Sequence, residues 1–162
     1  MSGAILPPIL ACIERMGMSL LSSLPELEKY LRDGGSGHGR RLGLRHLENG
    51  PDWVELALPY SPDQIGDPES GVIASGPILS MMDMATSLSV WLKLGGFRSH
   101  ATLDLRVDYL RPATPGKTVI GRGECYRITR SIAFVRGQAH DGDPEDPLAH
   151  VAGTFMALEG YR

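Results

Sequence analysis

The feature that most constrains this chain is a long apolar segment with one acidic residue in its interior. Residues 71–94 read GVIASGPILSMMDMATSLSVWLKL, with a Ser-Gly-Pro entry and a following pair of glycines. Proline suits the first turn of a helix, because its missing N–H would have no partner there. The segment therefore predicts a helix over 76–94 with Ser75 or Gly76 as its N-cap. A carboxylate on a mostly apolar helix is costly to bury without partners, which makes Asp83 a candidate functional residue.

Helical spacing gives this segment two faces. The apolar, core-like face consists of Ile78, Met82, Ala85, Ser89 and Leu92. A narrow polar face places three side chains three or four positions from Asp83, namely Ser80, Thr86 and Ser87. On these residues alone, Asp83 is either a solvated or interfacial side chain or a general base. The unpaired N–H groups at the helix start favour an anionic oxygen, so Ser75 and Gly76 form either a plain cap or an oxyanion-binding site.

The rest of the chain alternates strand patterns with turns. Strands are predicted over 41–48, 53–59, 100–110, 117–129, 131–140 and 147–158. Before them, residues 9–32 have helical spacing interrupted at Pro25, and the glycine-rich run 33–39 predicts a flexible linker. One long helix among several strands predicts an α+β fold, with an antiparallel sheet packed on the helix. We expect an N-terminal helical extension over 1–33 and one domain over 40–160.

Composition and charge exclude several functions. The chain has 162 residues and a formal net charge of −3, so it has no basic footprint for nucleic acid. No apolar run approaches the ~20 residues of a membrane span, and the first residues lack the basic start of a signal peptide, so we expect a cytoplasmic protein. Cys12 and Cys125 predict two reduced thiols. The five histidines show no metal-ligand spacing, so no metal is expected.

Two stretches of the sequence resemble one family. GVIASGPILSMMDMATSLSVW, followed by ATLDLRVDYLRPATPGKTVIGRGECYRITRSIAFVRGQAHD, resembles the hot-dog acyl-CoA thioesterases of the phenylacetate-pathway, PaaI-like type. The resemblance extends over about residues 40–158, including the closing Ala-Gly-Thr-Phe of 152–155. It implies a hot-dog fold, in which an antiparallel sheet wraps around a long central helix. It also implies an acyl-CoA substrate, no cofactor beyond the coenzyme A of that substrate, and a homodimer or a dimer of dimers.

The resemblance assigns roles to particular residues. Asp83 matches the carboxylate that activates water or attacks the thioester carbonyl. Ser75 and Gly76 match the two glycines of the family's His-Gly-Gly motif, where a backbone N–H polarises that carbonyl, and Ala74 replaces the histidine. Thr102 matches the Ser or Thr of the following strand, which positions the nucleophilic water in some members.

The resemblance also bears on coenzyme A and on two alternative functions. Arg111 and Arg130 stand where family members often place basic groups near the nucleotide of coenzyme A. Ala74 and Ser75 in place of His-Gly favour a hot-dog protein that binds acyl-CoA without hydrolysing it. A hot-dog hydratase or dehydratase would pair the helix acid with a histidine, for which His100 is the nearest candidate.

Overall fold

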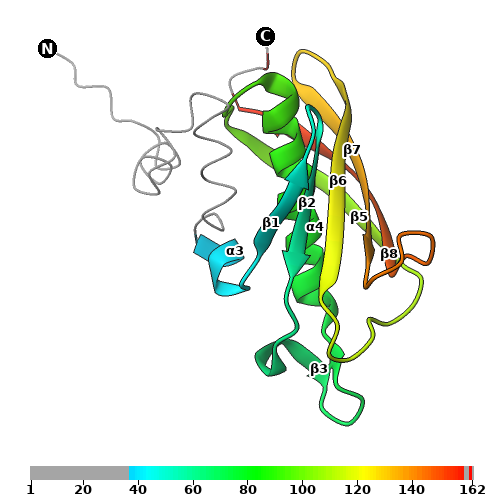
Figure 1. Cartoon of the computed structure of the whole chain (residues 1–162). Coiled ribbons are helices and arrows are strands. Elements are labelled where there is room, and N and C mark those ends of the chain that lie inside the picture. The colour runs from blue at the N-terminus through cyan, green and yellow to red at the C-terminus, as the bar shows by residue number, and fades with distance from the viewer. Residues whose placement is uncertain (1–36, 159–160, 162) are drawn as a thin grey trace, which may run out of the picture.

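The computed structural model describes residues 37–158 and 161, so the helices predicted over 9–32 lie outside the described residues. One long helix, α4 (Ser75–Leu94), packs on a six-stranded antiparallel sheet whose order is β1-β2-β6-β7-β8-β5. Its strands are β1 (Arg45–Asn49), β2 (Trp53–Leu58), β5 (His100–Tyr109), β6 (Val119–Ile128), β7 (Ile132–His140) and β8 (Ala149–Ala157). Figure 1 shows the sheet curving around α4. The predicted α+β architecture, with a sheet wrapped around a central helix, is confirmed.

Four short elements precede α4: α3 (Gly37–Arg41), the 3-10 helix η2 (Pro62–Gln64), β3 (Ile65–Asp67) and β4 (Val72–Ile73). The linker prediction was wrong for residues 37–39, which begin α3. The predicted first strand was also wrong at its start, since β1 begins at Arg45 rather than at residue 41. Gly39 explains both errors, because it is buried against Met84 of α4 and thereby holds this part of the chain as a packed turn of helix.

The apolar face of α4 forms the core, as predicted. Its five predicted core residues are all buried, with at most 6% exposure. The predicted polar face needs one correction: Thr86 is fully buried, and its hydroxyl donates to the carbonyl of Met82, one turn back along the same helix. The helix ends at Gly95, whose φ of 73° is a conformation that glycine adopts without strain.

Glycine on the inner face of β6 sets how closely α4 approaches the sheet. A Cβ atom on Gly123 would lie 2.5 Å from the carbonyl carbon of Ala85 and 2.6 Å from the amide nitrogen of Thr86. Because these are backbone atoms of α4, no side-chain rotation could relieve the contact. The middle of the helix therefore rests directly on the backbone of β6.

A β-bulge divides β5, one of the two edge strands of the sheet, into two halves. Thr102 pairs with Phe155 and Asp104 pairs with Thr154, so Leu103 is an extra residue with no counterpart on β8. Before the bulge, the even-numbered His100 and Thr102 point toward α4; after it, odd-numbered side chains do so. The bulge thus keeps one face of the whole strand directed at the helix.

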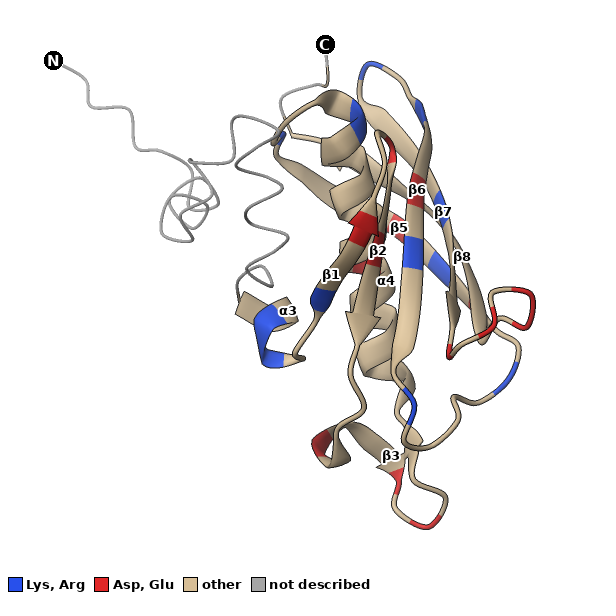
Figure 2. Ribbon diagram, viewed as in Figure 1, with Lys and Arg blue, Asp and Glu red and all other residues tan. Residues whose placement is uncertain are grey.

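The outer face of the sheet carries charged side chains that pair with one another. Arg122 binds Glu55 at 3.1 Å and its guanidinium stacks 3.6 Å from the ring centroid of Trp53, while Arg136 makes two hydrogen bonds to Glu124. Figure 2 shows an acidic and a basic position close together along β6. No helix in the described part of the chain is long and apolar enough to cross a membrane.

Candidate functional site

The exposed face of α4 carries the acid singled out in the sequence. Successive helical residues rotate by about 100°, so Leu79, Ser80 and Asp83 project from one side of the helix. The Asp83 side chain is half-buried, and its Oδ1 accepts a 2.9 Å hydrogen bond from the hydroxyl of Thr102 on β5. The fold thus brings together the predicted base and the predicted water-positioning residue, which are 19 positions apart in the sequence.

Strand β5 runs antiparallel to α4 and contacts it through three polar pairs. Near the C-terminal end of the helix, the Ser87 hydroxyl lies 2.8 Å from His100 Nε2. The Asp83–Thr102 pair follows one turn earlier on the helix. At the start of the helix, the Tyr109 hydroxyl donates to the Ser75 carbonyl at 2.9 Å. These pairs fix where the edge strand lies along the helix.

The start of α4 is open and has no side-chain cap. Its N-cap is Ala74, in extended conformation, so the predicted cap at Ser75 or Gly76 was wrong by at least one residue. Ser75 and Gly76 are exposed, and in the described part of the chain neither backbone N–H has a hydrogen-bond acceptor. Ser75 has no positive φ, so its Cβ is accommodated where the family motif has glycine.

A surface hollow adjoins this helix start. Its volume is about 260 Å³, and its lining includes Ser75, Ile78, Tyr109 and Leu110. Unpaired N–H groups beside a concave, partly apolar surface could polarise a carbonyl oxygen. Asp83 lies seven positions after Gly76, which is about 10 Å along the helix axis. Within one chain, the helix start and the acid are therefore too far apart to act on the same carbonyl group.

His100 is a residue of this region that the sequence assigned only to an alternative function. Its ring lies 5.0 Å from the ring of Phe155 and 5.8 Å from that of Trp91, centroid to centroid. Burial lowers its pKa to about 4, so the ring is neutral near pH 7. The sequence contained a pattern that could have placed His100 beside Asp83. His100 and Thr102 are two positions apart on a strand and so share a face, and Ser87 is one helical turn from Asp83.

The two arginines predicted to bind coenzyme A lie apart. Arg111 follows β5, near the start of α4, whereas Arg130 is exposed in the β6–β7 turn at the opposite end of the sheet (Figure 1). Both assignments stay predictions, and the structure does not join the two residues in one site.

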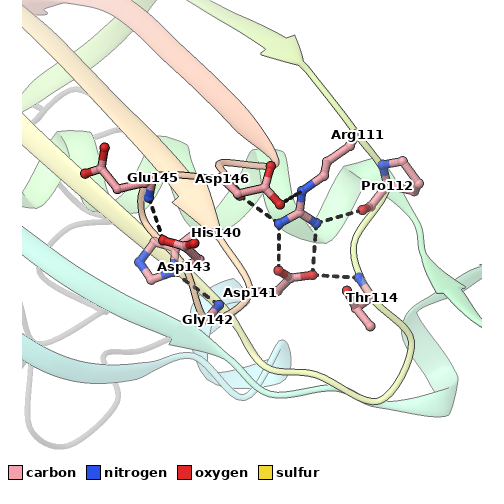
Figure 3. A network of polar contacts seen from close by, with 9 residues as sticks. All are labelled: Arg111, Pro112, Thr114, His140, Asp141, Gly142, Asp143, Glu145 and Asp146. Carbon is pink, nitrogen blue, oxygen red and sulfur yellow. Dashed lines mark hydrogen bonds and ion pairs between the residues drawn. The ribbon is translucent and has the colours of Figure 1, made fainter.

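The guanidinium of Arg111 is already engaged (Figure 3). It binds both carboxylate oxygens of Asp141 at 2.8 and 3.2 Å and the carbonyl of Asp146 at 2.7 Å. Its Nε lies 2.9 Å from Asp146 Oδ2 as an ion pair, although the angles do not meet hydrogen-bond geometry. Asp141 also accepts from the Thr114 N–H, so this network ties the β5–β6 connection to the β7–β8 turn.

The comparisons with known proteins identify the family. A family model of the thioesterase superfamily matches residues 70–148, which span α4, β5, β6 and β7. A solved protein from Pseudomonas aeruginosa is 42% identical in sequence, with a TM-score of 0.69 over 82% of this chain and 94% of its own. The chain belongs to the thioesterase superfamily. The predicted resemblance to hot-dog thioesterases is confirmed.

Two more distant solved structures share the fold of this chain. A thioesterase from Haemophilus influenzae has a TM-score of 0.73 at 20% identity, over 86% of this chain and 95% of its own. The PaaI protein of the Escherichia coli phenylacetic acid degradation operon has a TM-score of 0.65 at 12% identity, over 75% and 83%. The comparison with curated proteins gave no match. Among the described residues, no group of three or more His, Cys, Asp or Glu is placed to hold a metal ion.

Proposed function

We propose that this chain hydrolyses an acyl-CoA thioester to the free acid and coenzyme A. The observation that carries the proposal is the Asp83–Thr102 hydrogen bond, formed by the one acidic residue of a largely apolar helix. A half-buried carboxylate held in one orientation can take the proton of a water molecule as that water attacks the thioester carbonyl. The thiolate of coenzyme A is then the leaving group. Coenzyme A enters as part of the substrate, and the reaction needs no other cofactor.

The proposed oxyanion site comes from a second copy of the chain. The N–H groups of Ser75 and Gly76 lie about 10 Å along the helix from Asp83, so a complete site needs the helix start of a partner. The edge strand β5 favours such a partner, because it leaves large apolar side chains in contact with water. Leu103 on the strand is 52% exposed, and Leu110, directly after the strand, is 55% exposed. A homodimer, alone or as a dimer of dimers, would cover this edge and join the two half-sites. The free, buried thiol of Cys125 suits a reducing, cytoplasmic setting.

The experiment that tests hydrolysis compares the wild type with Asp83→Ala. Release of free thiol is followed with a thiol reagent over acetyl-, butyryl-, hexanoyl-, decanoyl- and phenylacetyl-CoA. We expect turnover of at least one ester, reduced in the variant by about 10²- to 10⁴-fold, the usual contribution of a general base. Circular dichroism and thermal unfolding check that the variant is folded. Undiminished turnover by folded Asp83→Ala would remove this residue from the mechanism.

A complementation experiment tests the two-subunit site. Ser75→Pro removes one proposed donor with little distortion, because Ala74 already has the extended ψ of 152° that a residue before proline prefers. Dimers that mix this variant with Asp83→Ala contain one intact site of two. Random mixing should therefore restore about a quarter of wild-type activity, because half of the dimers are mixed. A site built within one chain would give no recovery at all.

One observation favours acyl-CoA binding without turnover as a second candidate. The N-cap of α4 is Ala74, whose side chain makes no hydrogen bond, where the family motif has histidine. Tight binding of acyl-CoA without thiol release would support that function. The hydratase alternative has less support, because the neutral His100 ring contacts Ser87 and not Asp83.

A further inference from the structure

The short helix α3 lies against α4 beside the acid-bearing face. The His38 ring is 3.2 Å from the Ser80 hydroxyl, and Ser80 is less than one turn from Asp83. Gly39 makes this packing possible, because a Cβ there would lie 2.7 Å from the terminal methyl of Met84. The acid-bearing face of α4 is therefore bordered by β5 on one side and by α3 on the other.

The free side of α3 and the start of β1 present a group of positive charges. Arg40, Arg41 and Arg45 are all exposed, and within the described residues none of them has a hydrogen-bond or ion-pair partner. Figure 2 shows basic positions on α3 and at the neighbouring end of β1, with an acidic position further along β1. By contrast, Arg111 and Arg122 are both held by carboxylates. In a chain of net charge −3, three unpaired arginines within six positions form a local anion-attracting surface.

We propose that Arg40 and Arg41 bind the phosphate groups of the coenzyme A nucleotide. This inference rests on the proposed function, because it takes the thioester to lie at Asp83. A helix with its side chains is about 10 Å wide, and the pantetheine arm is long enough to span that width. The helix α3 packs directly beside the acid-bearing face. Exposed guanidinium groups bind phosphate oxygens in pairs, which suits the pyrophosphate and the ribose phosphate. Arg111 would have to give up bonds to Asp141 and Asp146 to do the same.

The test is titration calorimetry of the full chain with coenzyme A, with 3′-dephospho-coenzyme A and with pantetheine. The variant Arg40→Glu/Arg41→Glu should raise the Kd for coenzyme A by about 10- to 100-fold, the value of one or two charged hydrogen bonds. The ligand without its 3′-phosphate should lose less affinity, and the affinity for pantetheine should change least. Arg40→Lys/Arg41→Lys keeps the charge and should retain part of the affinity.

The matched control is Arg98→Glu/Arg127→Glu, which makes the same change in net charge at exposed positions outside α3 and β1. An equal loss in this control, or an unchanged Kd in the α3 variant, would overturn the inference. If coenzyme A binds through α3 but no ester is hydrolysed, the inference holds and the hydrolytic function fails. If the wild type binds no coenzyme A, both fail. Thermal unfolding of each variant verifies that the fold is intact.

Discussion

The hydroxyl of Thr102 donates a 2.9 Å hydrogen bond to Oδ1 of Asp83, which leaves Oδ2 of that carboxylate to accept a proton from water. Thr102→Val removes the hydroxyl and keeps the shape of the side chain. We expect kcat/KM to fall by about 10- to 100-fold, the worth of a hydrogen bond to a charged group. Thr102→Ser should restore activity to within a few-fold of the wild type. Equal activity of the Val and wild-type enzymes would show that Thr102 does not orient the base.

His100 should make the protein sensitive to mild acid. Burial lowers its pKa from 6.5 to about 4, so the unfolded chain binds a proton in that interval and the folded chain does not. The contribution of the neutral His100 ring to stability is therefore fully present above pH 6.5. It is lost as the pH drops toward 4, by about 3 kcal/mol in total. Urea unfolding at a series of pH values measures this slope. His100→Phe should flatten the slope between pH 6.5 and 4, and an unaltered slope would assign the acid sensitivity to other groups.

Asp141 should stabilise the junction between the β5–β6 connection and the β7–β8 turn. Its side chain is 4% exposed and is held by Arg111 and the Thr114 N–H. Asp141→Asn removes the charge that pairs with Arg111 and should cost about 2 to 4 kcal/mol, measured by chemical unfolding at neutral pH. The exposed Asp143, whose carboxylate accepts a hydrogen bond from the Glu145 N–H, is the control, and Asp143→Asn should change stability by less than about 0.5 kcal/mol.

Asp141 should affect the stability of the fold over a lower pH range than His100 does. The hydrogen bonds from Arg111 lower the pKa of the Asp141 carboxyl below its usual value of 3.8. Its contribution is therefore present above pH 3.8 and is lost as the pH falls further. Asp141→Asn should remove acid sensitivity in that lower range and leave the slope between pH 6.5 and 4 intact.

Gly123 should tolerate no side chain. Its missing Cβ would fall within 2.6 Å of two backbone atoms of α4, so Gly123→Ala must push the helix away from β6. We expect a loss of more than about 3 kcal/mol or a failure to fold, by the usual cost of overpacking a core. Gly76 is the matched control, because a Cβ there meets nothing within 4 Å and alanine favours a helix. Melting temperatures of the two variants should therefore differ widely.

The sequence predicted the fold well because periodicity records which side of each element is buried. The α4 stripe of Ile78, Met82 and Leu92 is buried as its spacing indicated. Thr86 broke the pattern, because a hydroxyl that bonds to its own helix backbone can be buried like an apolar group. The glycine run also misled, because Gly39 allows close packing and not flexibility.

The candidate site was predicted in part. A family pattern assigned Asp83 and Thr102 to one site, with Thr102 holding the water that Asp83 would deprotonate, and in the structure the two side chains are hydrogen-bonded to each other. The engagement of Arg111 by Asp141 could not be read from the sequence, because the two residues are 30 positions apart in different turns. Whether a charged side chain is free or occupied depends on tertiary contacts, and this is the information that local pattern lacks.

The bulge at Leu103 places a constraint on the length of β5. His100 and Thr102 face α4 on even numbers, whereas Leu105, Val107 and Tyr109 do so on odd numbers. Losing one residue there would invert one half of the strand and turn Asp104 and Arg106 toward the helix. Relatives that keep this site should therefore vary freely in which residue occupies the bulge, yet show neither insertion nor deletion between His100 and Tyr109.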